Sequence, residues 1–165
     1  MSGEKVKVMN LDELSYEKHG HGEGFEAECG QIARSLGAEM LGYQIIKIPE
    51  GKKPFPLHFH YANEEMFLVM EGVGTLRDGA CERPLRVGDV IACPPGPGSE
   101  HQIVGGPGGI SVLAVSTRVA PEIVEYPESN KVGVLGGPPG ADPSGRTIRQ
   151  FMPKAEVRDY WDGEA

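Results

Sequence analysis

The sequence predicts an all-β fold, a barrel or a sandwich of many short strands. Three observations lead to this prediction. Apolar runs rich in β-branched residues recur through the middle of the chain, and turn signals separate them, as in strands of about five residues joined by tight turns. The chain has 24 glycines and 14 prolines among 165 residues, which suits many turns. No stretch keeps a helical repeat, and the length fits one domain.

The N-terminal part of the chain contains one clear strand. Residues 1–36 are expected to form an arm, and HGHGEGFE, which starts at His19, is interpreted as a mobile surface loop because of its glycines. Residues 29–36 fit either a strand or a short turn of helix. Residues 39–48 are a predicted strand, because β-branched and aromatic residues dominate this run and Pro49 ends it.

The central part contains the other expected core strands. Residues 65–70 are predicted to be a strand that is apolar and buried on both faces. The pair Asp78-Gly79 is a hairpin signal, and the glycines of residues 105–109 predict a turn before a last core strand at residues 110–117. Further short strands are expected at residues 57–60, 82–87, 90–93 and 100–104.

Residues 121–165 are expected to form a C-terminal extension, partly strand, that packs on the barrel or on a second copy of the chain. Residues 121–133 alternate apolar and charged side chains, which fits an outer sheet. Residues 147–152 fit one more strand, and the glycine-rich residues 136–145 predict an exposed loop. The only tryptophan, Trp161, follows a tyrosine, and this aromatic pair is expected to dock the tail rather than to bind a ligand.

Charge and cysteine content narrow the class of protein. The chain has 24 acidic and 16 basic residues and a net charge of −8, which disfavours nucleic acids and anionic membrane surfaces as partners. No apolar run is long enough to span a membrane, and the N-terminus lacks a charged-then-apolar leader. Cys29, Cys81 and Cys93 form no CxxC pair and are interpreted as reduced thiols. These features together predict a cytoplasmic protein.

Two histidines of the central part indicate a metal site. His58 and His60 are two residues apart on a predicted strand, so their imidazoles point to the same side. Neutral imidazole commonly binds Zn, Fe, Ni and Cu, and the carboxylate of Glu65 can complete the set after a short turn. A solvated strand face is the alternative interpretation of such a pair. His19 and His21 have the same spacing, but their glycine neighbours favour a surface loop.

The stretch from Gly51 to Gly72 resembles the first motif of the cupin superfamily. Four residues separate His60 from Glu65 and six separate Glu65 from Gly72, as that motif requires, whereas Gly51 lies one residue further from His58 than usual.

A second cupin-like motif begins at Gly88, in GDVIACPPGPGSEHQIVG, with Pro94 and Gly96 at the expected spacings. His101 matches the remaining ligand of the family. The gap from Gly96 to His101 is two residues longer than in the usual motif, and Gly105 stands where the family often has asparagine.

The resemblance implies a double-stranded β-helix, a jelly-roll-like barrel, over residues 37–120, with the motif strands facing inward. The resemblance also implies that the chain binds one divalent transition metal (Zn, Mn, Ni or Fe). Small single-domain cupins commonly pair as homodimers, so a homodimer is expected as well. The metal ligands implied are His58, His60, Glu65 and His101.

A small molecule is the expected partner of such a site, and its candidate contacts are Tyr43, Gln44 and Phe67. Lys52, Lys53 and Arg118 could meet an anionic substrate at the mouth, with solvation at the surface as the alternative for each. Glu64 is interpreted as a solvated rim residue rather than a general base. Cys93 fits either a buried small apolar residue or a reactive thiol of the pocket.

The resemblance favours a metalloenzyme like the sugar or sugar-phosphate isomerases, in which no catalytic residue beyond the ligands is assigned. An Fe-dependent dioxygenase and a non-catalytic module that binds or senses a small ligand are the alternatives, because one fold hosts many functions.

Overall fold

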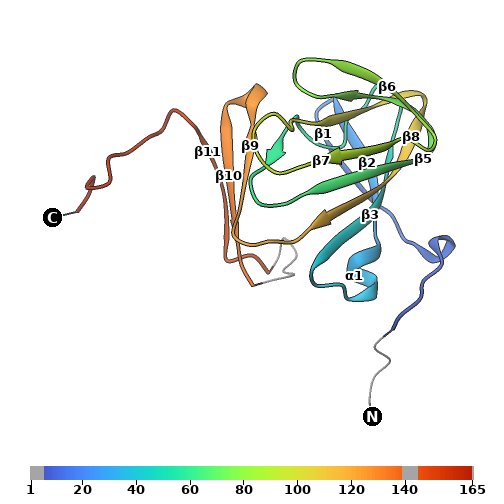
Figure 1. Ribbon diagram of the computed structural model, residues 1–165, viewed down its shortest axis with the longest axis horizontal. Coiled ribbons are helices and arrows are strands. Elements are labelled where there is room, and N and C mark those ends of the chain that lie inside the picture. Colours follow the sequence, from blue (N-terminus) through green and yellow to red (C-terminus); the bar gives the residue numbers. More distant parts are fainter. Residues whose placement is uncertain (1–5, 139–144, 165) are drawn as a thin grey trace, which may run out of the picture.

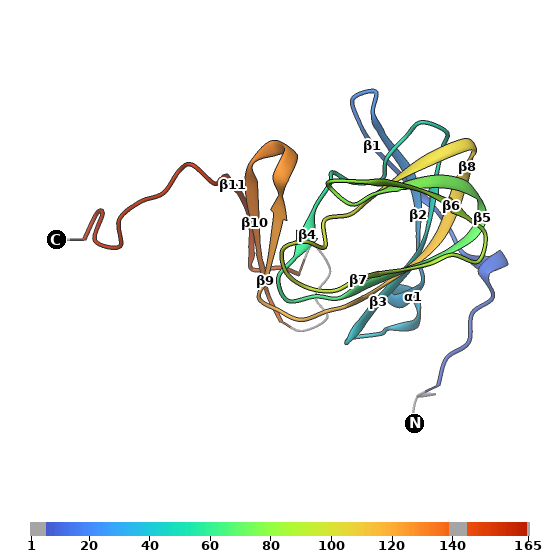
Figure 2. The same cartoon turned by 45° about the horizontal axis from the view of Figure 1, so that its top comes forward.

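The computed structural model describes residues 6–138 and 145–164, and its strands form two antiparallel sheets there (Figures 1 and 2). The first sheet has seven strands in the order β1-β2-β3-β8-β5-β6, with β7 also paired to β5, and the second has the order β11-β10-β9-β4. The all-β prediction is therefore confirmed. The strands of the first sheet are β1 (Glu17–His21), β2 (Phe25–Gln31), β3 (Leu41–Ile48), β5 (Glu65–Arg77), β6 (Glu82–Arg86), β7 (Val90–Cys93) and β8 (Gln102–Thr117).

The long antiparallel pair of β5 and β8 forms the middle of the barrel. Side chains alternate between the two faces of a strand, so every second residue of β5, β3 and β8 points into the barrel. Ile46, Val69 and Val112 pack there with at most 1% of their surface exposed. This core gives the barrel a rigid wall at the strand ends that carry the candidate site.

Two expectations for these long strands were wrong. Residues 65–70 were expected to be buried on both faces, but only Phe67 and Val69 are buried, since one face of β5 packs on the core and Met70 is exposed. Residues 105–109 were expected to form a turn, but they lie within β8, whose pairing with β5 shifts register near Gly72. Gly72 has a φ of 74°, and an added Cβ would lie 2.2 Å from the Gly109 carbonyl oxygen, so glycine lets the two backbones approach here.

The N-terminal segment adds a hairpin to the barrel sheet. The glycine-rich segment that was expected to be a mobile loop instead forms β1 and the start of β2, which pair in register from Glu17↔Cys29 to His21↔Phe25. Residues 29–36, which fitted either a strand or a turn of helix, contain both: β2 ends at Gln31, and a short helix, α1 (Ile32–Leu36), follows. A 3₁₀ turn, η1 (Leu11–Glu13), precedes β1.

The C-terminal sheet joins the barrel through one short strand. β9 (Glu122–Tyr126) pairs with the two-residue strand β4 (Phe59–His60), and a 3₁₀ turn, η2 (Pro127–Ser129), connects β9 to β10 (Lys131–Gly136). β11 (Ile148–Pro153) completes this sheet, as the sequence predicted. The exposed loop predicted at residues 136–145 lies largely outside the described residues.

The chain beyond β11 extends away from both sheets (Figures 1 and 2). The aromatic pair Tyr160 and Trp161 was expected to dock this tail, but the two residues are 83% and 70% exposed. Their rings contact each other at 4.8 Å between centroids and form an edge-to-face pair. Within the single chain, this pair therefore does not dock the tail on either sheet. Within residues 6–138 and 145–164, no helix has the length and apolar character needed to cross a membrane.

Candidate metal centre

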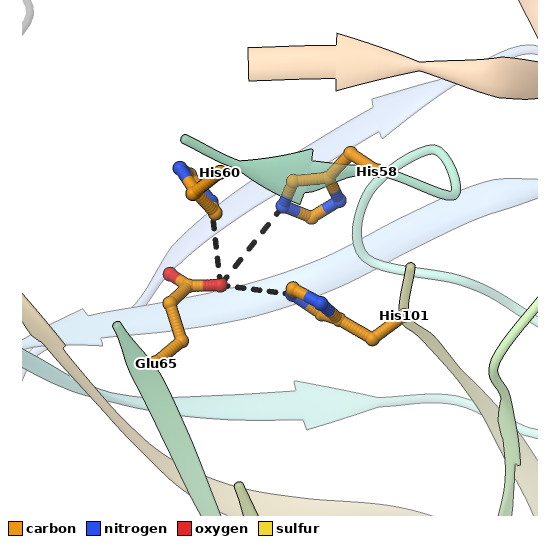
Figure 3. A group of neighbouring side chains, drawn as sticks. All are labelled: His58, His60, Glu65 and His101. Atoms are coloured by element: carbon orange, nitrogen blue, oxygen red, sulfur yellow. Dashed lines mark hydrogen bonds and ion pairs between the residues drawn. The ribbon is translucent and has the colours of Figure 1, made fainter. Parts of the chain in front are cut away.

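Three segments of the chain bring four side chains that could bind a metal together at the end of the barrel (Figure 3). His58 and His60 lie in and beside β4, Glu65 is the first residue of β5, and His101 directly precedes β8. An isolated antiparallel bridge joins the two ligand segments, in which the backbone N–H of His101 donates to the carbonyl of His58 at 2.9 Å. The candidate ligand atoms all lie within 4.8 Å of one another.

One carboxylate oxygen lies among the three imidazoles. Glu65 Oε2 is 2.9 Å from His101 Nε2, 3.4 Å from His60 Nε2 and 4.0 Å from His58 Nε2 (Figure 3). Both ring nitrogens of His60 are buried and make no hydrogen bond. Three imidazole nitrogens and one carboxylate oxygen are a donor set that suits a divalent transition metal. The residues present therefore fit the metal that the sequence implied.

Local hydrogen bonds turn two of the rings toward this centre. His58 Nδ1 lies 2.8 Å from the Pro56 carbonyl oxygen, and His101 Nδ1 lies 2.9 Å from that of Ser99. Because a carbonyl only accepts, each Nδ1 carries a proton, and Nε2 is the nitrogen that each ring turns toward the centre. His60 has no such carbonyl; its Nδ1 lies 3.7 Å from Glu122 Oε2.

The pKa of each of the four groups depends strongly on the other groups of the cluster. Burial alone would raise the pKa of Glu65, but the hydrogen bond with His101 and the nearby imidazole of His60 outweigh burial and hold that pKa far below its usual range. Burial disfavours the charged form of His60 and His101, yet contacts of His60 with Glu122 and Glu65 raise its pKa to about 9. Contacts of His101 with Cys93 and Glu65 raise its pKa to about 10. Burial lowers the pKa of His58 to about 4. A divalent cation can therefore replace the protons that the metal-free cluster holds.

Two adjoining cavities open beside this cluster, with volumes of about 180 Å³ and 330 Å³. His60 and Glu122 line the smaller cavity, and Tyr43 and Gln44 line the larger. Both cavities are lined by Glu65, Ser116, Arg118 and Arg146. The wall beside the centre therefore combines polar and apolar residues and carries two guanidinium groups.

The predicted substrate contacts are placed in different surroundings. Gln44 lies at the cavity and accepts a hydrogen bond from Gln31. Tyr43 lines the same cavity, but it also packs against a second apolar cluster under α1. Phe67 is 8% exposed and belongs to the barrel core, where its ring lies 5.6 Å from that of His101. Phe67 therefore supports a ligand residue from behind.

Several other residues named from the sequence lie around the site. Glu64 is exposed, and its backbone bonds to Thr117 at the rim. Cys93 is buried in β7, directly opposite Glu65. His19 and His21 are exposed on β1, and the metal-capable group found in the described part of the chain does not include them.

Sequence reasoning missed the contribution of β9. Glu122 is 5% exposed and faces His60, and Tyr126 stacks on His58 with 5.9 Å between ring centroids. The alternation in residues 121–133 indicated a strand in this region. It did not reveal that the strand would pair with β4, since pairing partners depend on the course of the whole chain.

Comparison with known proteins agrees with the fold and the motifs. Residues 44–113 match the family model of the cupin domain. A proposed sugar phosphate isomerase from Acidithiobacillus ferrooxidans is similar at a TM-score of 0.77 and 22% identity, over 93% of this chain and 94% of that one. A cupin-superfamily sugar phosphate isomerase from Silicibacter pomeroyi is similar at a TM-score of 0.74 and 22% identity, over 94% of this chain and 98% of that one.

A proposed oxalate decarboxylase from Thermotoga maritima is similar over less of this chain, 67%, and over 98% of its own length, at a TM-score of 0.56 and 24% identity. No curated protein matches the sequence. At these identities the structures share a fold with this chain, and the fold does not carry function with it. Together with the match over residues 44–113, they show that the chain has the cupin fold and that this segment is similar to a cupin domain.

Proposed function

We propose that this protein is a metal-dependent isomerase that acts on a sugar or a sugar phosphate. The observation that carries the proposal is the position of the four-residue cluster, which borders a cavity with Arg118 and Arg146 in its wall. The two solved structures that are similar over more than nine-tenths of both chains are sugar phosphate isomerases by name, which supports the same choice.

His58, His60, Glu65 and His101 would hold the metal, through three Nε2 atoms and one carboxylate oxygen. Four protein ligands leave one or two positions of a divalent ion open, which is the property that separates catalytic from structural sites. When bound, such an ion supplies Lewis acidity that polarises a carbonyl group. The pKa of Glu65, held far below its usual range, keeps this carboxylate ionised at neutral pH, as a ligand requires.

The wall of the cavity favours a substrate with a negative group. Burial lowers the pKa of Arg146, and the nearby Arg149 and Arg118 lower it further, so these guanidinium groups make one positive region. Arginine binds phosphate and carboxylate groups through paired N–H donors. Ser116 and Gln44 line the larger cavity as well and offer hydrogen bonds to hydroxyl groups.

The experiment that tests this proposal compares turnover with oxygen use. Protein loaded with Zn(II), Mn(II) or Fe(II) would be incubated with aldoses, ketoses and their phosphates in D₂O, and NMR would follow interconversion and deuterium uptake. We expect isomerisation with more than one divalent metal and no oxygen consumption. Turnover with Fe(II) alone and with O₂ loss would show a dioxygenase instead. Tight binding of a sugar that is returned unchanged would show a binding module.

A further inference from the structure

We propose that Glu122 is the positioning residue for His60, and that it fixes the tautomer with which His60 reaches the metal. Glu122 lies on β9, outside residues 44–113 that match the cupin domain. The C-terminal sheet would thus supply a part of the metal centre that the barrel lacks. This inference rests on metal binding by the cluster and is independent of the reaction catalysed.

His60 differs from the other two histidines because no local carbonyl holds its ring. Each of the others bonds through Nδ1 to the carbonyl two residues earlier in the chain, Pro56 for His58 and Ser99 for His101. The corresponding carbonyl for His60 is that of His58, which accepts the backbone N–H of His101 at 2.9 Å. His60 therefore needs an acceptor from elsewhere, and Glu122 Oε2, at 3.7 Å from Nδ1, is the carboxylate at that position.

Glu122 is itself held by donors on every side. Its Oε1 accepts the backbone N–H of Tyr61 at 3.1 Å and that of Ala62 at 3.2 Å, and its Oε2 accepts from the side-chain amide of Asn63. The buried side chain of Asn63 is in turn fixed, since its Oδ1 accepts from Val119 N–H at 2.6 Å. These hydrogen bonds fix the orientation of the carboxylate, whose Oε2 faces Nδ1 of His60.

The identity of these partners requires an ionised carboxylate at position 122. All of the groups around it donate protons, and a carboxylate is the side chain that only accepts. The nearly isosteric amide of Glu122→Gln would turn an NH₂ group toward one set of donors, whichever way it was rotated. Because a carboxylate that faces the outer nitrogen of a ligating histidine orients its ring, removing this one should weaken metal binding about 10- to 100-fold.

The test uses Glu122→Gln beside Glu125→Gln as the matched control. Glu125 lies on the same strand, is half-buried and bonds to the hydroxyl of Tyr61 and to Lys154, away from the cluster. Zinc affinity would be measured by competition with a chelating dye, and the absorption spectrum of the Co(II) protein would report the ligand field. We expect Glu122→Gln to weaken zinc about 10- to 100-fold and to alter the Co(II) spectrum, whereas Glu125→Gln changes neither.

Unchanged zinc affinity and an unchanged spectrum in Glu122→Gln would overturn the proposal, and so would equal losses in both variants. If Glu122→Gln does not fold, ¹H–¹⁵N NMR of the zinc-loaded wild type decides the question, because the proposal requires His60 protonated at Nδ1 and bound through Nε2. Binding through Nδ1 would contradict it. A wild-type protein that binds no metal at all would instead refute the metal site of the proposed function.

Discussion

The two sheets of this protein contribute to the site in opposite ways. The seven-stranded barrel sheet is well packed, with Ile46, Val69 and Val112 nearly inaccessible. The four-stranded C-terminal sheet leaves Ile148 and Phe151 more than 40% exposed. Even so, the smaller sheet and the segment leading into it place Glu122, Tyr126 and Arg146 beside the metal ligands. The first sheet thus gives the packed core and Glu65, and the second sheet gives His60 and the groups that surround the cluster.

The largest effect should come from the difference in packing. Ile46→Ala removes a side chain that is 1% exposed, and we expect it to lower the free energy of unfolding by about 3 kcal/mol through lost burial and a residual cavity. Ile148→Ala, at a position that is 45% exposed in β11, should change that free energy by less than about 0.5 kcal/mol. Denaturant unfolding of both metal-free variants checks this. Equal losses would mean that β11 is as tightly packed at Ile148 as the barrel core is at Ile46.

The second prediction separates two neighbouring carboxylates. Glu65→Gln should weaken metal binding by more than about 100-fold, because it removes a ligand from the centre, whereas loss of a residue that only orients a ligand costs about 10- to 100-fold. Glu64→Gln should leave the affinity unchanged, since Glu64 is exposed at the rim. Competition with a chelating dye measures both variants. Similar affinities for the two would show that Glu65 is not a ligand.

The third prediction concerns pH. Because the pKa of His60 is raised to about 9 and that of His101 to about 10, both rings are protonated at pH 7 in the metal-free protein, while His58 is neutral with a pKa of about 4. Metal binding should therefore release about two protons, and the affinity should fall roughly 100-fold for each pH unit below 7. Titration calorimetry in buffers of different ionisation enthalpy counts the protons. An enthalpy independent of the buffer would contradict this assignment.

The fourth prediction has the smallest expected effect and tests the contribution of Arg146. Arg146→Met should weaken the binding of a sugar-alcohol phosphate about 10-fold, because it removes one charge-assisted contact, and should leave the matching sugar alcohol unaffected. Arg158→Met is the control, since Arg158 lies in the exposed tail and pairs with Asp162. Equal weakening of both ligands would show that Arg146 shapes the cavity rather than binds the phosphate.

The sequence predicted the barrel well because its signals were local. Strand-forming runs ended by turn residues placed β3 and β7 within about two residues, and the spacing of His58, His60 and Glu65 named three members of the cluster. Long-range features were not predictable in this way. The pairing of β4 with β9, which brings Glu122 to His60, depends on contacts between residues about 60 positions apart. The turn predicted from the glycines at residues 105–109 was wrong for a related reason. Pairing with β5 continues strand β8 through these residues, although the local signal indicates a turn.

The most direct test of the account is the metal content of the purified protein. After exhaustive dialysis, elemental analysis should find about one divalent transition metal per chain, because one set of three imidazoles and one carboxylate is present. Protein stripped with a chelator should take up about one equivalent of Zn, Mn, Ni or Fe(II) again. Less than about a tenth of an equivalent, with no uptake of any of these ions, would contradict the metal centre on which the proposed function depends.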